Sequence, residues 1–430
     1  MQDKKYTVAI LGVGARGGNV YGRLIMQFPE RFQIVALCDV RAQRLEAFGE
    51  EFGVEESLRF TDENEFFKEK RADLLVIATQ DADHVRHCLK AFETGYDILM
   101  EKPITDKKEE CQAVLDAQEK SGCKALICHV LRYAPAFLKA AELIESGAIG
   151  RLVAIDALER VTYWHQAHSY VRGNWRTTKE TAPMILAKCC HDLDLIQYYA
   201  KSKCKSVSSV GELTYFNKEN QPQGASNRCL DCKYVESCPY SAKTLYLDRW
   251  KKAYSPTDYW PYNVLVPAPV TEEKLTDALK NGPYGRCVFA CDNDVVDHQL
   301  TLLNFENGVK ATLTMTAFTT DDKSELYGLG RRMNFHGTLG EIVLDELSDS
   351  VEWMPFGEEK QVFKINALGD NGYGHGGGDF FLIKELCNML DGNANAATSL
   401  TASIESHLMG ICAEESRLKD GERIFIHEKN

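Results

Sequence analysis

Residues 7–18 of this 430-residue chain, TVAILGVGARGG, decide its fold. Residues 8–11 form a short apolar, β-branched run of the kind that builds a buried parallel strand. The chain then enters residues 12–17 with the spacing G-x-G-x-x-G, and a helical pattern follows over residues 19–28. The order strand, glycine-rich turn, helix predicts a Rossmann unit that binds the pyrophosphate of a dinucleotide at the helix N-terminus.

Each residue of the turn has a place in this prediction. Gly12 permits the tight turn, Gly14 lets the backbone approach the pyrophosphate, and Gly17 allows close packing of helix on strand. Ala15 and Arg16 complete the turn. We therefore predict that all five residues contact the cofactor.

A second apolar run, residues 33–38, ends at Asp39, which lies 22 residues after Gly17. An acidic residue about 20 positions after the turn accepts from the ribose 2′-hydroxyl in such units. Asp39 favours NAD, because the 2′-phosphate of NADP would meet a carboxylate. Arg41 weakens this preference, since an arginine there can pair with that phosphate. The alternative is that Asp39 only caps the next helix.

The composition narrows the class of protein. Hydrophobic residues make up 44% of the chain and charged residues 26%, as in globular proteins. The formal charge of −13 argues against a nucleic-acid partner or an anionic membrane surface. No apolar run of about 18 residues occurs, and the N-terminal segment leads into a strand rather than a signal peptide. We expect a cytoplasmic protein.

Strand and helix patterns alternate through the first 130 residues, which predicts a parallel sheet. Thr79, Glu101 and His129 each follow a predicted strand, so they should meet at one edge of that sheet with the turn. After residue 150 the pattern becomes strands with short turns, which predicts a mostly antiparallel sheet with helices on one face. The expected architecture is thus a Rossmann domain at 1–130 and an α+β domain at 131–430, with an irregular, cysteine-rich insertion at about 217–293.

Four motifs occur in a fixed order: the glycine turn, Glu-Lys-Pro at 101–103, Arg-Tyr-x-Pro at 132–135, and Gly-Thr-x-Gly at 337–340. Together they resemble the Gfo/Idh/MocA oxidoreductases, the family of glucose–fructose oxidoreductase and inositol dehydrogenase. The resemblance implies NAD(P) binding, with Thr79, Glu101 and Lys102 at the cofactor site. It also implies sugar or polyol substrates and an open C-terminal sheet whose free face often forms a homodimer or homotetramer.

The resemblance also suggests catalytic residues. Lys102 matches the lysine of the family's Glu-Lys-Pro motif, where a cation can stabilise the reacting oxygen. His191 matches the family's catalytic histidine, and a neutral imidazole suits removal of a hydroxyl proton. The family usually has an aspartate four residues earlier, but Ala187 stands there. Lys188, three residues before His191 on a predicted helix 184–200, could share its face and orient it or bind substrate.

Two alternatives weigh against these catalytic assignments. Lys102 could be an ordinary surface lysine beside Glu101. His191 could be a helix-face histidine whose ring is satisfied by Asp192 or Asp194.

Between residues 163 and 176 the chain is rich in aromatic, histidine and arginine side chains, which suit a polyol pocket. An oligomer interface would have a similar composition. The predicted substrate residues are Tyr163, His165, His168, Asn174, Trp175 and Arg176. A glycine-rich loop at 374–379 either brings His375 or Asp379 towards the site or lets Asp379 cap a helix.

The insertion carries Cys229-x2-Cys232-x5-Cys238, followed by Cys287-x3-Cys291. Four thiolates at such spacings suit a structural zinc ion. We predict Cys287 as the fourth ligand, with Cys291 as the next choice. An iron–sulfur cluster and unligated thiols are the alternatives.

The sequence therefore predicts an NAD-dependent oxidoreductase that acts on a sugar, polyol or glycoside, with His191 as base and Lys102 on the oxygen. One rival is a redox glycosidase that uses bound NAD transiently. The other is a non-catalytic nucleotide-sensing protein on the same fold.

Overall fold

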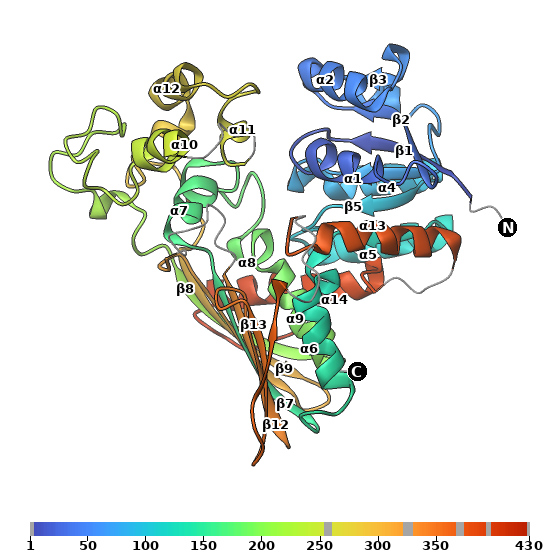
Figure 1. Cartoon of the computed structure of the whole chain (residues 1–430), viewed down its shortest axis with the longest axis vertical. Helices are drawn as coiled ribbons and strands as arrows, with labels where there is room; N and C mark the ends of the chain where they lie inside the picture. The colour runs from blue at the N-terminus through green and yellow to red at the C-terminus, as the bar shows by residue number, and fades with distance from the viewer. Residues whose placement is uncertain (1–3, 253–259, 321–329, 367–373, 393–396, 428–430) are drawn as a thin grey trace.

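The computed structural model describes residues 4–252, 260–320, 330–366, 374–392 and 397–427, which are built around two β-sheets (Figure 1). Sheet A is parallel throughout and has the strand order of a Rossmann fold. The order is β3 (Arg59–Phe60), β2 (Phe32–Cys38), β1 (Tyr6–Leu11), β4 (Leu74–Ile77), β5 (Asp97–Met100) and β6 (Ala125–Ile127). The helical segments between these strands are η1 (Gly17–Gly22), α1 (Arg23–Ile25), α2 (Ala42–Phe52), η2 (Glu56–Leu58), α3 (Glu63–Phe66), η3 (Asp81–Asp83), α4 (His84–Thr94) and α5 (Lys108–Ser121).

The helix expected over residues 19–28 begins earlier, as the π-helix η1, and continues as the short helix α1. Two glycines explain how closely α2 packs on it. A Cβ added to Gly18 would lie 2.6 Å from the Phe48 ring, and one added to Gly22 would lie 2.5 Å from the Phe52 ring. Because only glycine leaves room for these rings, α2 can pack directly on the helix that starts at the turn.

Helix α13 (Gly378–Asp391), from the far end of the chain, also belongs to the sheet A layer (Figure 1). Its buried residues Leu382 and Leu386 lie in the same hydrophobic cluster as Val8 and Ile10 of β1. Part of the segment that the sequence analysis placed in the second domain therefore completes the core of the first.

Sheet B is mixed: β7 and β10 run parallel, and the other described neighbours run antiparallel. Its order is β14 (Gln361–Lys364), β13 (Ser350–Pro355), β12 (Gly340–Asp345), β11 (Arg331–Gly337), β7 (Leu152–Arg160), β10 (Lys310–Thr316), β9 (His298–Phe305), β8 (Cys204–Glu212) and β15 (Ile424–Phe425). One face is covered by α6 (Pro135–Glu145), α9 (Cys190–Ala200) and α14 (Leu400–Leu418). The expected combination of a Rossmann sheet with a mostly antiparallel sheet is confirmed.

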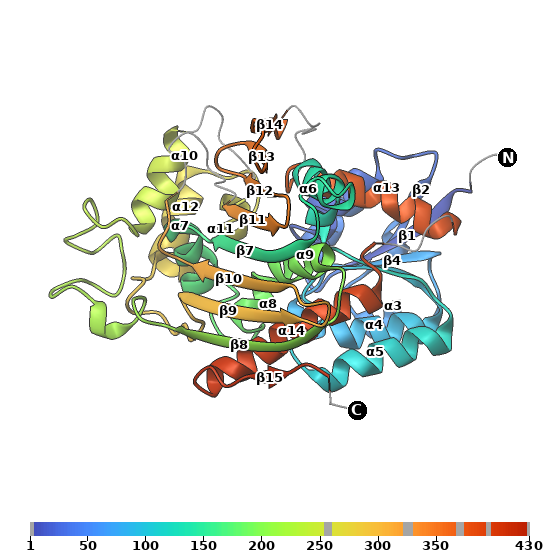
Figure 2. The same ribbon diagram turned by 90° about the horizontal axis from the view of Figure 1, so that it is seen from below.

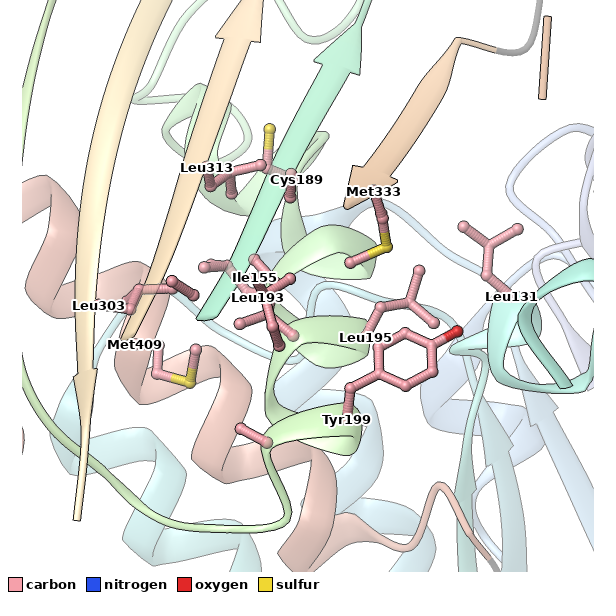
Figure 3. Close-up of a cluster of buried hydrophobic side chains, with 14 of the residues drawn as sticks. Leu131, Ile155, Cys189, Leu193, Leu195, Tyr199, Leu303, Leu313, Met333 and Met409 are labelled. Carbon is pink, nitrogen blue, oxygen red and sulfur yellow. The ribbon is translucent and has the colours of Figure 1, made fainter. Parts of the chain in front are cut away.

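The main core lies between sheet B and these helices (Figure 3). Leu193 of α9 packs towards Ile155 of β7, and Leu195 of α9, Leu313 of β10 and Met409 of α14 belong to the same cluster. All five side chains are at most 1% exposed. Burying one such side chain contributes about 1.5–3 kcal/mol. This layer fixes α9 against the centre of sheet B.

The prediction of a single helix over residues 184–200 is wrong, because the chain forms two helices there. The structure breaks it into α8 (Met184–Ala187) and α9, because the backbone of Cys189 has ψ 6° and leaves the helical region. Lys188 and His191 therefore do not share the face of one continuous helix. The chain reaches α8 through η4 (Val130–Tyr133), α6, β7, α7 (Tyr163–His165) and η5 (Gln166–Arg172).

The other face of sheet B carries exposed apolar side chains. Val210, Leu300 and Leu302, from the neighbouring strands β8 and β9, are each about half exposed. Figure 2 shows β7, β10, β9 and β8 side by side from this direction.

The insertion has more order than its sequence suggested. Its helical segments are η6 (Lys218–Asn220), η7 (Lys243–Asp248), α10 (Arg249–Lys252), α11 (Tyr262–Leu265), α12 (Glu272–Asn281) and η8 (Pro283–Gly285). Aromatic residues such as Tyr246 and Tyr262 give it a hydrophobic cluster that Trp164 and Val171 join from the segment after β7. Among the described helices none is long and apolar enough to span a membrane.

Candidate active site

The glycine turn has a shape that its residues require. Gly12 has φ +89°, and a Cβ added there would lie 2.5 Å from the carbonyl oxygen of Ala78, just beyond β4. A Cβ on Gly17 would overlap the carbonyl of Gly12. A Cβ added to Gly14 would meet a side chain rather than backbone, since its nearest atom would be Nη1 of Arg44 at 3.1 Å. The turn thus packs tightly on the sheet and faces a guanidinium, so the residues present fit a dinucleotide pyrophosphate.

Asp39 lies where β2 ends and is 7% exposed. One carboxylate oxygen accepts from the N–H of Arg41 at 2.9 Å, and the other lies 3.5 Å from Nη1 of Arg44. Arg44 was missed by the sequence analysis, because its place on α2 gives no sign that it reaches both Gly14 and Asp39. The predicted ribose acid therefore already has a cationic neighbour.

Ala15 and Thr79 were also predicted to lie at the cofactor site. Ala15 is exposed on the turn. Thr79 follows β4, and its hydroxyl is 2.9 Å from Nδ1 of His87, whose Nε2 is 2.8 Å from Glu63. The Thr79 hydroxyl is thus already engaged within the sheet A layer.

Arg16 and Glu101, both predicted to bind cofactor, bind each other. Nε of Arg16 lies 2.6 Å from Glu101, and Nη2 lies 2.7 Å from Asp379 at the start of α13. The Tyr21 hydroxyl also donates to Glu101 at 2.7 Å. Burial alone would favour the neutral acid, but the Arg16 and His375 charges hold the pKa of Asp379 well below its usual range. Asp379 is therefore an anion that anchors the turn. Helix α13 has Gly377 as its N-cap residue and no side-chain cap hydrogen bond, so Asp379 does not cap this helix.

Lys102 follows β5 beside this network. Burial works against its charge, but Cys190, Glu101 and Asp81 raise the pKa of Lys102 above its ordinary value. Asp81, at the start of η3, was not predicted; it accepts from Nε1 of Trp175 at 3.0 Å. Lys102 is thus a half-buried cation at the strand ends, and Asp81 joins this edge of sheet A to a predicted substrate residue.

His191 is 5% exposed near the start of α9. Its ring centroid lies 5.9 Å from that of His129 and 5.9 Å from that of His375. Within the described residues Nδ1 of His191 is buried without a hydrogen-bond partner. Burial first, and then the charges of Lys102 and Arg331, hold the pKa of His191 well below its ordinary value. The imidazole is therefore neutral at neutral pH, with a free ring nitrogen.

The alternative in which Asp192 or Asp194 satisfies His191 is wrong. Asp194 binds Arg132 through two bonds of 2.6 Å. Asp192 lies 3.0 Å from Nε of Arg331. Both aspartates are engaged by arginines.

Lys188 lies 3.3 Å from Glu159, whose other carboxylate oxygen is 2.7 Å from Nη2 of Arg331. Glu159, Asp192, Arg331 and Lys188 form what we call the acid cluster, beneath α9. Burial, together with the charge of Glu159, raises the pKa of Asp192 to about 7 against the effect of Arg331. The sequence analysis missed Glu159 and Arg331 because they lie on two paired strands far apart in the chain.

The segment 163–176 divides between the two sides of the molecule. His165 lies close enough to Lys188, Arg331 and Lys102 for their charges, after burial itself, to hold the pKa of His165 well below its ordinary value. Trp175 reaches Asp81. The other members face elsewhere: Tyr163 accepts from Arg249, His168 stacks on Tyr284 and lies 2.9 Å from the Tyr246 hydroxyl, Arg176 pairs with Asp292, and Asn174 is exposed.

In the insertion, the four predicted metal ligands line one cavity of about 280 Å³, which we call the thiol cavity; they are Cys229, Cys232, Cys238 and Cys287. Cys291 is not among its lining residues. Within the described parts of the chain, no group of three or more His, Cys, Asp or Glu side chains is already arranged to hold a metal ion.

A Rossmann sheet with a phosphate-binding turn, a half-buried lysine and a neutral histidine at its edge defines a class of nucleotide-dependent oxidoreductases. Comparison with known families gives the same class. Residues 6–129 match the model described as "Oxidoreductase family, NAD-binding Rossmann fold", and residues 137–227 match the GFO/IDH/MocA C-terminal domain. The chain belongs to the Gfo/Idh/MocA oxidoreductase family.

Individual relatives are distant. The protein YteT of Bacillus subtilis, named as an oxidoreductase, is 22% identical over 403 residues, which is 88% of each chain. The scyllo-inositol 2-dehydrogenase (NAD(+)) of the same organism is 25% identical over 48% of this chain and 57% of its own length. A solved levoglucosan dehydrogenase, in complex with NADH and levoglucosan, superposes with a TM-score of 0.69 over 99% of this chain and all of that one, at 17% identity. That structural likeness shows the shared fold.

Proposed function

We propose that this protein is an NAD-dependent oxidoreductase that transfers hydride between a nicotinamide and a hydroxyl-bearing carbon of a sugar, polyol or glycoside. The observation that carries the proposal is the pairing of a half-buried lysine cation with a neutral histidine, Lys102 and His191, at the edge where the sheet A strands end. Relatives named for inositol and levoglucosan support the substrate class.

The chain's own residues supply binding and proton transfer. The turn at residues 12–17 holds the pyrophosphate, and Asp39 accepts from the ribose. When bound, the nicotinamide accepts or supplies the hydride. His191 takes the hydroxyl proton on its free Nδ1, and Lys102 stabilises negative charge on the same oxygen. His165 and Trp175 orient the substrate.

Asp39 favours NAD over NADP in this proposal. Arg44 and Arg41 act in the opposite direction, since Arg44 lies 3.5 Å from the same carboxylate. We infer that the contact with Arg44 keeps the carboxylate directed at the ribose.

We also propose that the chain works in the cytoplasm as a homodimer or homotetramer formed through the free face of sheet B. The half-exposed Val210, Leu300 and Leu302 support this interface. All fifteen cysteines are free thiols, which suits a reducing compartment.

The test uses purified protein with NAD and a panel containing myo-inositol, scyllo-inositol and levoglucosan, followed by NADH absorbance. With a substrate of this class, Lys102→Met and His191→Asn should each lower kcat/KM by about 10²–10⁴-fold, because charge stabilisation or proton transfer is lost. Lys120→Met, an exposed lysine on α5, is the control and should keep wild-type turnover. Full turnover in Lys102→Met would refute the catalytic assignment.

The same assay separates the rivals. In a dehydrogenase, free NADH grows with turnover. In a redox glycosidase, NADH stays near zero while an aryl glycoside is cleaved. A nucleotide-sensing protein would bind NAD and turn over none of these substrates.

A further inference from the structure

The thiol cavity is built by two chain segments that are held together by backbone hydrogen bonds. Arg228 and Arg286 form an antiparallel bridge between them. On either side of this bridge, the N–H of Cys229 and the N–H of Cys287 each donate to the opposite segment, at 2.9 and 2.8 Å. The N–H of Cys232 returns to the carbonyl of Cys229 at 3.1 Å, in a tight turn. The backbone hydrogen bonds thus hold the two cysteine-bearing segments against the same thiol cavity.

The cavity also contains a buried arginine for which the described residues provide no carboxylate partner. Arg172, the last residue of η5, is 1% exposed and lines the thiol cavity. Its Nε and Nη2 donate to the carbonyls of Arg286 and Tyr240, both at 2.7 Å, and Nη2 also lies 3.4 Å from Sγ of Cys229. Within the described residues, Nη1 is buried without a partner.

A buried guanidinium without an anion is costly. The other groups around Arg172 in the described residues are carbonyls, thiols and the Tyr246 hydroxyl, which are neutral at neutral pH, so we infer that something else in the cavity supplies negative charge. Four thiolates around a divalent ion carry a net charge of −2, and their sulfurs accept N–H bonds from a second shell. The cavity combines the ligands of such a centre with a cation that would offset part of its negative charge.

We propose that Cys229, Cys232, Cys238 and Cys287 bind one zinc ion as a closed tetrathiolate site and that Arg172 offsets one of its two negative charges. On binding, the four thiols release four protons to solvent, four Zn–S bonds form, and neither zinc nor sulfur changes its oxidation state. The four thiols are not set around one point in the described structure, so the proposed site requires their side chains to rotate towards a common centre. Cys291, whose Sγ contacts the carbonyl of Cys287 at 3.3 Å, stays outside the site.

The proposed zinc site lies next to the segment that carries the predicted substrate residues. Arg172 ends the helical segment that follows His165, and Trp175 comes three residues later. Zinc is therefore a structural ion that holds this segment against the insertion, at a distance from the reacting groups.

The test begins with elemental analysis of the full-length protein purified without added metal. We expect about one zinc per chain. Cys→Ser variants at positions 229, 232, 238 and 287 should each lose it, whereas the matched control Cys291→Ser should keep it. No stoichiometric metal, iron with acid-labile sulfide, or loss of zinc in Cys291→Ser with retention in Cys287→Ser would each overturn the proposal.

A measurement on the unmodified chain covers the case in which a cysteine variant fails to fold. Zinc is removed with a chelator and replaced by cobalt(II), and the absorption spectrum is recorded. Thiolate-to-cobalt charge-transfer bands with the intense visible bands of tetrahedral cobalt are expected. A weak octahedral spectrum would overturn the four-thiolate assignment.

Discussion

Arg331 beneath the active site and Arg172 in the insertion are both buried, but their surroundings neutralise them differently. Arg331 lies 2.7 Å from Glu159 and 3.0 Å from Asp192, so carboxylates balance its charge within the acid cluster. Arg172 meets two carbonyls and one thiol. The chain thus supplies its own anions in one region and only potential anions, the thiols, in the other.

This difference separates two uses of a buried charge. In the acid cluster the charges balance one another and support α9, which carries His191. In the thiol cavity the balance is completed only when a metal converts thiols to thiolates. The stability of the first region should therefore be independent of metal, and that of the second should depend on it.

The largest expected effect comes from breaking the acid cluster. Arg331→Met removes the guanidinium that contacts both Glu159 and Asp192 and leaves Lys188 as the remaining cation of the acid cluster, so it should cost about 3–5 kcal/mol of unfolding free energy. Urea denaturation measures it. The neighbouring exposed residue gives the control, Arg332→Met, which should change stability by less than about 0.5 kcal/mol. Equal stability of the two variants would show that the cluster is not a balanced charge set.

The pH dependence of stability should have opposite signs in the two regions. Asp192 has a pKa raised to about 7, so between about pH 4 and 7 the folded protein binds more protons there than the unfolded chain. Its stabilising contribution is present at low pH and is lost as the pH rises through 7. Burial, and then Arg172, lowers the pKa of His168 to about 3. The stability that neutral His168 contributes is complete above pH 6.5 and is lost as the pH falls towards 3.

Two variants measure these pH dependences separately. Each titrating group can change the free energy of unfolding by up to about 1.4 kcal/mol per pH unit. Asp192→Asn should make stability rise more steeply from pH 4.5 to 6.5, because a falling contribution is removed. His168→Phe keeps the stacking on Tyr284 and should make the rise shallower. Denaturation series at several pH values measure both. Parallel slopes for wild type and both variants would contradict the burial of these charges.

The sequence predicted what is encoded in contiguous residues. The glycine turn and its strand and helix lie within residues 6–22, and the geometric demand on Gly12 and Gly17 is local, so their pattern was sufficient. Lys102 and His191 were predicted as catalytic residues because they match short motifs of the family that the sequence resembles. The switch from a parallel to a mostly antiparallel sheet was also readable, since it depends on strand spacing along the chain.

What the sequence did not reveal depends on distant partners. The pairing of Arg16 with Asp379 joins residues 363 positions apart, and no local pattern signals it. The break at Cys189 was missed because residues 184–200 have a continuous helical composition, while Lys188 is drawn to Glu159 on β7. Likewise, the burial of Arg172 follows from packing of the insertion, which periodicity does not describe.

The smallest effect gives the sharpest comparison between the two arginines. Arg172→Met should lower stability by about 1–3 kcal/mol more in the zinc-loaded protein than after chelation, because the hydrogen bonds of a guanidinium to charged sulfur are lost only when the metal is bound. Arg172→Lys, which keeps the charge, should recover part of this difference. Arg176→Met, at a half-exposed arginine paired with Asp292, should be insensitive to zinc. If chelation changes the effect of Arg172→Met and Arg176→Met equally, the thiol cavity does not hold an anionic centre, and the buried charge of Arg172 is balanced in another way.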